Sequence, residues 1–143
     1  MVWEIEKELP MIIADPSRLE QVFINLLLNA RDAIEERWGS MEFERADKRI
    51  TLKTSYDAQH VICEICDTGV GVPQAMADKI FEPFFTSKEV GKGTGLGLSI
   101  SYGIIKDCGG NIQVIPNKTA GACFVLNFPL PEYNNGKQHP TCR

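Results

Sequence analysis

The segment VGKGTGLGLSI, Val90 to Ile100, has glycine at four alternate positions, Gly91, Gly93, Gly95 and Gly97, directly before an apolar stretch. Glycine-rich turns that lead into helices commonly bind phosphate, because the bare backbone amides and the helix dipole both favour anions. The segment is not a Walker P-loop, since its Gly-Lys pair is followed by Gly93 rather than by a hydroxyl residue. It is not a dinucleotide-binding Gly-x-Gly-x-x-Gly motif either, since leucine occupies the position of the last glycine. The neighbouring motifs must therefore decide what this loop binds.

The whole chain has the size and composition of one ordinary domain. It has 143 residues, 43% hydrophobic and 24% charged, and its net charge of -4 argues against nonspecific nucleic-acid binding. The longest apolar run, residues 22–28, is interrupted by Asn25 and is far shorter than the roughly 20 residues of a membrane span, and the first residues do not form a signal peptide. We therefore expect a soluble, cytoplasmic domain over residues 1–131 and a polar, disordered tail over residues 132–143. Because the chain opens directly on a predicted strand, we expect it to be part of a longer protein.

The cysteines predict a reduced, cytosolic chain. There are five, an odd number, and they are scattered along the sequence. Cys63 and Cys66 form a nominal Cys-x-x-Cys pair, but they lie in a predicted strand, where residues three apart point to opposite faces. We therefore expect neither a metal site nor a redox pair from these two residues.

The hydrophobic pattern predicts a two-layer α/β sandwich. Apolar residues at spacings of three and four predict a helix from Pro16 to about Arg37, with Asp15 as its N-cap. Residues 49–57 and 60–67 are predicted to form an antiparallel hairpin, and residues 111–116 and 121–130 a second one. The remaining predictions are an edge strand at 3–9, an apolar strand at 11–14, a surface loop at 38–48, a short helix after Pro73 and a helix at 95–107. This order of elements gives a mixed β-sheet with its helices packed on one face.

The first predicted helix carries an unusual polar face. Gln21, Asn25, Asn29 and Asp32 recur at steps of four and three residues, opposite the apolar face. Asparagine is a poor helix former, so two of them inside an apolar run favour a function over a simple solvated face, which remains the alternative. The amide oxygen of Asn29 is a suitable ligand for Mg²⁺, which prefers oxygen and often shares phosphates with its protein site.

The segment CDTGVGVP places Asp67 at the end of a predicted strand, with Gly69 and Gly71 directly after it. A carboxylate there can accept a hydrogen bond from the exocyclic amine of a base, while the glycines let a flat ring lie against the backbone. Taken alone, the segment is more typical of an ordinary turn between a strand and a helix.

The segment FEPFFTSK brings Phe81, Phe84 and Phe85 together just before the glycine loop. We expect at least one of these rings to pack in the core. Aromatic residues at the base of a glycine-rich segment also suit the anchor and hinge of a mobile lid.

In this order and at these spacings, four segments resemble the ATP-binding catalytic domain of bacterial histidine kinases. NLLLNARDA resembles the N box of that family, DTGVG its G1 box, FEPFFTSK its F box and GKGTGLGL its G2 box. The resemblance extends from about Pro10 to Leu130, which is nearly the whole chain. It implies the Bergerat fold of the GHKL ATPases, with ATP and Mg²⁺ as ligands.

The resemblance also implies roles for individual residues. Asn29 would bind Mg²⁺, Asn25 would lie beside the phosphates and Lys92 would reach the terminal phosphates, so these three are the expected catalytic residues. Asp67 would accept the adenine amine, and the amides of residues 93–98 would contact the phosphate chain. The implied nucleotide-binding residues are Asn25, Asn29, Asp32, Asp67, Gly69, Gly71, Phe81, Phe85, Lys92, Gly93, Thr94, Gly95, Leu96, Gly97, Leu98 and Cys123.

The sequence departs from the family pattern in two places. Cys123 stands where the family often has threonine, which weakens an expected hydrogen bond toward the water network near adenine. The phosphoacceptor histidine is missing, since His60 lies in a predicted strand, His139 lies in the tail, and neither has the acidic neighbour of the acceptor motif. The acceptor is therefore expected on a separate dimerisation domain of a longer parent protein, through which the chain would also serve a response regulator.

The sequence thus predicts the catalytic domain of a sensor histidine kinase in two-component signal transduction. One alternative is an ATP-hydrolysing clamp of the same superfamily, such as the gyrase, mismatch-repair and heat-shock chaperone ATPases, which use a glutamate where this chain has Asn25. A second alternative is a nucleotide-sensing pseudokinase. Only activity with an acceptor domain would separate this module from the kinase.

Overall fold

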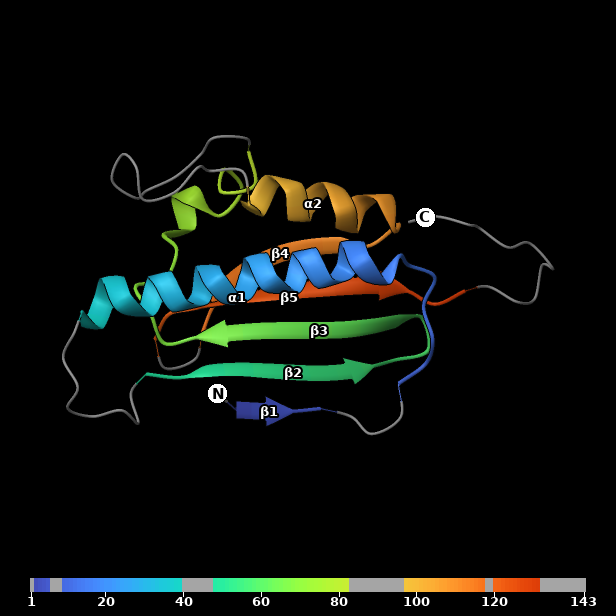
Figure 1. The fold of residues 1–143 in the computed structure, drawn as a ribbon, viewed down its shortest axis with the longest axis horizontal. Coiled ribbons are helices and arrows are strands. Elements are labelled where there is room, and N and C mark those ends of the chain that lie inside the picture. The colour runs from blue at the N-terminus through green and yellow to red at the C-terminus, as the bar shows by residue number, and fades with distance from the viewer. Residues whose placement is uncertain (1, 6–8, 40–47, 83–96, 118–119, 132–143) are drawn as a thin grey trace.

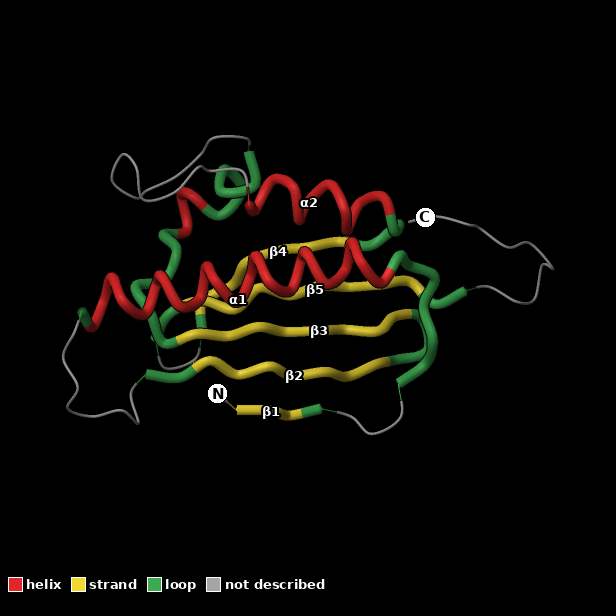
Figure 2. The backbone as a smooth tube through the Cα atoms, in the orientation of Figure 1, coloured by secondary structure: helices red, strands yellow, loops and turns green. Residues whose placement is uncertain are grey.

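The structure is a computed structural model that describes residues 2–5, 9–39, 48–82, 97–117 and 120–131. In chain order its elements are β1 (Val2–Glu4), α1 (Pro16–Trp38), β2 (Ile50–Tyr56), β3 (His60–Asp67), the 3-10 helix η2 (Gln74–Met76), α2 (Gly97–Asp107), β4 (Asn111–Pro116) and β5 (Ala122–Pro129). The strands form one mixed sheet in the order β1-β2-β3-β5-β4, in which β1 is parallel to β2 and the other neighbours are antiparallel. Figures 1 and 2 show this sheet as one layer, with α1 and α2 in contact with each other on one face. The two-layer α/β prediction is confirmed.

The ends of α1 follow from local chemistry. The carboxylate of Asp15 accepts a hydrogen bond from the N–H of Ser17 (2.9 Å), and Pro16 occupies the first turn, where its missing N–H costs nothing. At the other end Gly39 has a positive φ of 61°, and its N–H donates to the carbonyl of Glu35 (2.7 Å). Within the described ranges, no helix combines the length and the apolar composition that crossing a membrane requires.

The core lies between the helices and the sheet. Buried side chains recur every four residues on α1 (Val22, Leu26, Ala30, Ile34) and every second residue on β3 (Val61, Cys63, Ile65, Asp67). Phe124, Leu126 and Phe128 of β5 complete the same cluster. Among the buried residues that the structure describes, Asp67 is the only charged one. Burying a carboxylate is costly, so this position requires an explanation other than packing.

The remaining element predictions have mixed outcomes. Residues 11–14 form no strand: Met11 is 87% exposed, whereas Ile12 and Ala14 pack against the core, so their apolar character reflects packing rather than a ladder. The predicted edge strand is described from Val2 to Glu4, and its residues 6–8 lie outside the described residues; the short helix after Pro73 is the 3-10 helix η2. The predicted hairpins and the two long helices are confirmed, although α2 is described only from Gly97. Most of the predicted loop 38–48 and the tail 132–143 lie outside the described residues.

Candidate functional site

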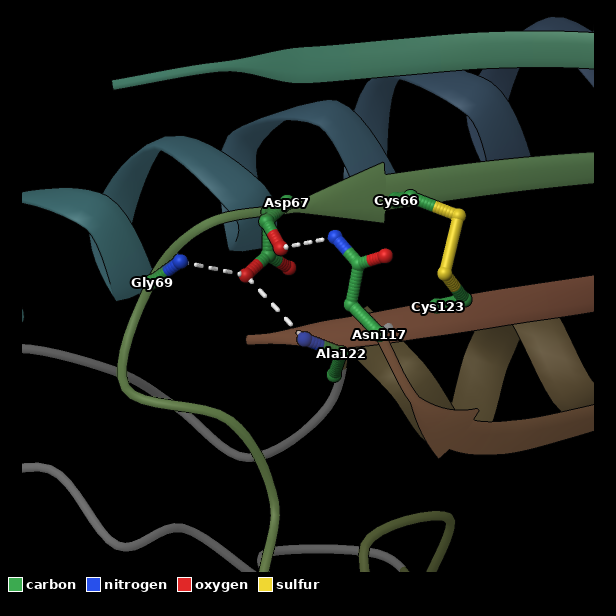
Figure 3. Close-up of a disulfide and its surroundings, with 6 residues drawn as sticks. All are labelled: Cys66, Asp67, Gly69, Asn117, Ala122 and Cys123. Atoms are coloured by element: carbon green, nitrogen blue, oxygen red, sulfur yellow. Dashed lines mark hydrogen bonds between the residues drawn. A yellow bond between two sulfur atoms is a disulfide. The ribbon is translucent and has the colours of Figure 1, made fainter. Parts of the chain in front are cut away.

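Asp67 lies at the C-terminal end of β3, at the end of the inward-facing row. It is 1% exposed, and its Oδ1 accepts hydrogen bonds from the N–H of Gly69 (2.8 Å) and the N–H of Ala122 (3.4 Å), as Figure 3 shows. Oδ2 accepts no hydrogen bond from any other described residue. Burial raises the pKa of this carboxyl, and the two backbone amides oppose part of that rise. Asp67 is thus a buried acceptor with one oxygen fixed by the protein and one left for a donor.

The glycines around Asp67 allow close approaches between backbone segments. A Cβ on Gly69 would lie 2.5 Å from the carbonyl carbon of Ala33, so only glycine lets this turn touch α1. Gly71 and Gly121 both have positive φ, 79° and 86°. A Cβ on Gly121 would overlap the main-chain oxygen of Asp67 and lie 2.7 Å from its Oδ1. These glycines therefore bring three backbone segments together around one carboxylate.

Asn25 connects the polar face of α1 to the start of α2. Its Nδ2 donates to the carbonyl of Gly97 (3.2 Å) and to the hydroxyl of Ser101 (3.3 Å), and its Oδ1 accepts from Nε2 of Gln21 (2.9 Å). The fully buried hydroxyl of Ser101 also donates to the carbonyl of Gly97 (2.9 Å). These bonds hold the first turn of α2, which directly follows the glycine segment, against α1. Because an amide is not a general base, Asn25 does not match the glutamate of the ATP-hydrolysing clamps.

Asn29 and Asp32 continue the same face of α1. Asn29 is half-buried, and its side chain makes no hydrogen bond to another residue of the described part of the chain. Asp32, with its side chain 30% exposed, forms an ion pair with Arg31 (3.0 Å). The described residues contain no cluster of three or more His, Cys, Asp or Glu side chains suited to a metal ion. A Mg²⁺ ion at Asn29 would therefore take its other ligands from phosphates and water, as this ion commonly does.

Phe81 is the only predicted lid aromatic that lies among the described residues. Its ring packs 5.6 Å from the ring of Tyr102 on α2 and 6.2 Å, edge to face, from that of Phe124 on β5. Phe81 therefore ties the chain before the glycine segment to the core, and Leu98 on the first turn of α2 packs against the same cluster. The other predicted site residues in this region, Phe84, Phe85, Lys92, Gly93, Thr94, Gly95 and Leu96, lie outside the described residues.

The prediction of reduced cysteines is wrong for Cys66, Cys108 and Cys123, each of which is disulfide-bonded. Cys66 on β3 and Cys123 on β5 are directly opposite each other, with Cα atoms 4.0 Å apart, and a disulfide joins them (Figure 3). The sulfur of Cys123 therefore has no thiol hydrogen to offer to the adenine region. The prediction that Cys63 and Cys66 point to opposite faces is confirmed, because burial alternates along β3: Cys63 is buried and Cys66 lies on the other face. Cys63 is a free thiol. Burial raises the pKa of Cys63 to about 11.

Three residues of this region were not found from the sequence. Ser101 orients Asn25, Gly121 lies against Asp67, and Asn117 donates its side-chain N–H to the carbonyl of Asp67 (2.9 Å). The glycine before the last strand was a signal for Gly121. No sequence pattern pointed to Asn117, because its contact is made 50 residues away along the chain.

Comparisons with known proteins agree with this geometry. The model of the family described as histidine kinase-, DNA gyrase B- and HSP90-like ATPase matches residues 14–132. Sensor kinase CckA of Brucella abortus is 43% identical over 86% of the chain, and sensor histidine kinase ZraS of Escherichia coli is 38% identical over 85% of it. The chain spans only 14% and 24% of the length of these two relatives.

Solved structures give the same result. The catalytic domain of histidine kinase ThkA is 34% identical and matches 90% of this chain and 78% of its own with a TM-score of 0.72. Full-length ShkA in complex with AMPPNP is 27% identical and matches 99% of this chain and 25% of its own with a TM-score of 0.71. The chain therefore belongs to the histidine kinase-, DNA gyrase B- and HSP90-like ATPase family, and within it to the ATP-binding catalytic domains of sensor histidine kinases.

Proposed function

We propose that this chain binds Mg²⁺-ATP and transfers its γ-phosphate to a histidine on a separate dimerisation domain. That domain would belong to a longer parent kinase, exposed to the cytoplasm, which signals through a response regulator. The observation that carries the proposal is the buried carboxylate of Asp67, which has one oxygen held by two amides and one without a described partner. Such an acceptor suits the exocyclic amine of adenine.

The base would lie against the turn that follows Asp67. The side-chain positions of Gly69 and Gly71 face Ala33 and Gly121, so these glycines let the turn pack closely beside Asp67 and would shape the surface that the ring contacts. The carboxylate would accept a hydrogen bond from the 6-amino group, whereas a 6-oxo purine would place an acceptor against an acceptor. A buried group left unpaired in this way discriminates strongly between substrates.

The phosphates would extend from the base toward the start of α2. Asn25 holds the first turn of α2 against α1, which places the N-terminal end of this helix beside the polar face that carries Asn29. In this proposal Asn29 contributes a neutral oxygen to Mg²⁺, which neutralises phosphate charge when bound. Lys92 and the amides of residues 93–98 would bind the phosphate chain. Catalysis would then consist mainly of positioning and charge neutralisation.

The chain itself offers no suitable acceptor among its described histidines. His60 begins β3 and Asp67 ends it, so the two are separated by the length of the strand, ~23 Å at the usual rise per residue. The ring of His60 faces Asp57 (3.7 Å) rather than the nucleotide region. We therefore assign the acceptor histidine to another domain.

Thermal unfolding with and without Mg²⁺-ATP tests the binding part of the proposal. Ligand at a hundredfold its Kd should stabilise the chain by about 2.7 kcal/mol, seen as a higher melting temperature. Asn29→Ala should lose the part of this shift that depends on Mg²⁺, whereas Asn111→Ala, an exposed position on β4, should keep it. A full magnesium-dependent shift in Asn29→Ala would remove Asn29 from the site.

A further inference from the structure

Among the described residues of the turn between β4 and β5, Asn117 is the one whose side chain bonds to Asp67. Nδ2 of Asn117 donates to the main-chain oxygen of Asp67 (2.9 Å; Figure 3). The N–H of Asn117 also donates to the carbonyl of Gly121 (3.1 Å), which joins the two described sides of the turn. The paired register of β3 and β5 ends at Cys66 and Cys123, so Asp67 lies one residue beyond the ladder, where Ala122 of β5 bonds to its side chain instead of its main chain. The Asn117 amide therefore extends the attachment between these strands one residue beyond the ladder.

The same turn forms part of the surroundings of the Asp67 carboxylate. The turn supplies Ala122, whose N–H is one of the two donors to Oδ1, at 3.4 Å and thus near the limit of a hydrogen bond. It also supplies Gly121, whose backbone lies directly against Asp67. A small displacement of the turn would break the bond to Ala122 and let the carboxylate rotate. The second donor, Gly69, belongs to the chain after β3 and cannot replace it.

We propose that Asn117 is a positioning residue for base recognition: it holds the β4–β5 turn against Asp67 so that Oδ1 stays occupied and Oδ2 faces the amino group of the purine. This inference rests on the proposed function and deepens it, because it names a determinant of the preference for 6-amino over 6-oxo purines. Asn117 need not touch the nucleotide to have this effect.

A purely structural role for Asn117 makes a different prediction. If the residue only closed a turn, its loss would lower the stability of the chain and weaken the binding of all nucleotides to a similar extent. If it positions Asp67, its loss lowers the selectivity for the 6-amino group specifically. The ratio of two Kd values therefore separates the two roles, since general effects on folding or on charge cancel in it.

The test compares ATP with inosine triphosphate, which carries an oxygen in place of the 6-amino group and, as a consequence, a hydrogen on N1. Isothermal titration of each with the wild-type chain, Asn117→Asp and Asn117→Ala gives the ratio Kd(ITP)/Kd(ATP). Asn117→Asp keeps the shape of the side chain but cannot donate, and the same substitution at exposed Asn111, at the other end of β4, is the matched control. All titrations are made in the cold, below the melting transition of each variant.

We expect the ratio to fall about fivefold in both Asn117 variants, the size of one lost hydrogen bond, and to be unchanged in Asn111→Asp. An unchanged ratio in both Asn117 variants, with wild-type selectivity intact, would overturn the inference and leave the proposed function standing. A wild-type chain that binds the two nucleotides equally would overturn both, because Asp67 would then not read the base.

Discussion

Replacing Asp67 by asparagine should reverse the base preference of the chain. The new side chain has nearly the same shape, and its single carbonyl oxygen can take the place of Oδ1 between the amides of Gly69 and Ala122. Its amino group would then occupy the position of Oδ2 and point at the base. A donor that faces the 6-amino group of adenine cannot bind it, whereas it can donate to the 6-oxo group of inosine.

The size of the effect follows from the hydrogen bond that is lost. Hydrogen bonds to charged groups contribute about 1.5 to 3 kcal/mol, so ATP should bind Asp67→Asn about 10-fold to 150-fold more weakly than it binds the wild-type chain. Inosine triphosphate should bind the variant more tightly than the wild type. Isothermal titration of both nucleotides measures the two changes, and Asp57→Asn, at an exposed turn at the other end of β3, should change neither.

Asp67→Asn should raise the stability of the nucleotide-free chain, although it weakens the binding of ATP. The folded-state pKa of Asp67 is raised, chiefly by burial, so the carboxyl favours folding below its unfolded pKa and loses this contribution as the pH rises through its folded pKa. At neutral pH the wild-type chain therefore carries a cost that asparagine does not. Without nucleotide, Asp67→Asn should melt at a higher temperature than the wild type at neutral pH, and the difference should shrink toward roughly pH 4.

A stabilised variant that no longer binds ATP would show that the buried charge is retained for binding rather than for folding. Unchanged ATP affinity in Asp67→Asn would refute the assignment of Asp67 to the base. Loss of affinity for ATP and inosine triphosphate in equal proportion would refute the donor and acceptor argument, since it would indicate a general disturbance of the pocket.

Two further predictions concern the cysteines. The Cys66–Cys123 disulfide has a sequence separation of 57 residues, so its loss should lower the free energy of unfolding by about 4 kcal/mol on the chain-entropy model. Urea unfolding of the wild type and of the double variant Cys66→Ala, Cys123→Ala measures this, since a dithiol would also reduce the disulfide of Cys108, and coincident curves would show that the bond contributes nothing. The thiol of Cys63, with its pKa raised to about 11, should resist alkylation near neutral pH until the chain unfolds. Peptide mass spectrometry locates the label, and rapid labelling of Cys63 in the native chain would contradict its burial.

Sequence patterns predicted the features that depend on neighbours along the chain. The cap at Asp15, the apolar spacing of α1 and both hairpins are local signals, and each appears in the structure where it was predicted. The asparagines of α1 were recognised because they are unusual within a helix. The position of Asp67 at the end of a strand was also predictable, but its burial became clear only when the sheet and the helices were in place.

The features that the sequence did not reveal depend on contacts between distant segments. The disulfide requires β3 and β5 to be neighbours, although 57 residues separate its cysteines. The bond from Asn117 to Asp67 depends on the same strand pairing, and a single asparagine in a turn gives no indication of it. The apolar segment 11–14 was assigned to a strand because packing against a core and membership of a sheet produce the same short apolar run.

Phosphate transfer in a mixture of separate domains tests whether this chain phosphorylates a histidine on another domain. The chain is incubated with ATP labelled at the γ-phosphate, alone and together with the helical domain of its parent that carries the candidate histidine. We expect no label on this chain in either reaction, and acid-labile, alkali-stable label on the helical domain only when both are present. Transfer should be slow, because separation removes the effective concentration that the native linkage provides. Label on this chain alone would contradict the assignment of the acceptor, and ATP binding without transfer to a verified acceptor would contradict the kinase activity itself.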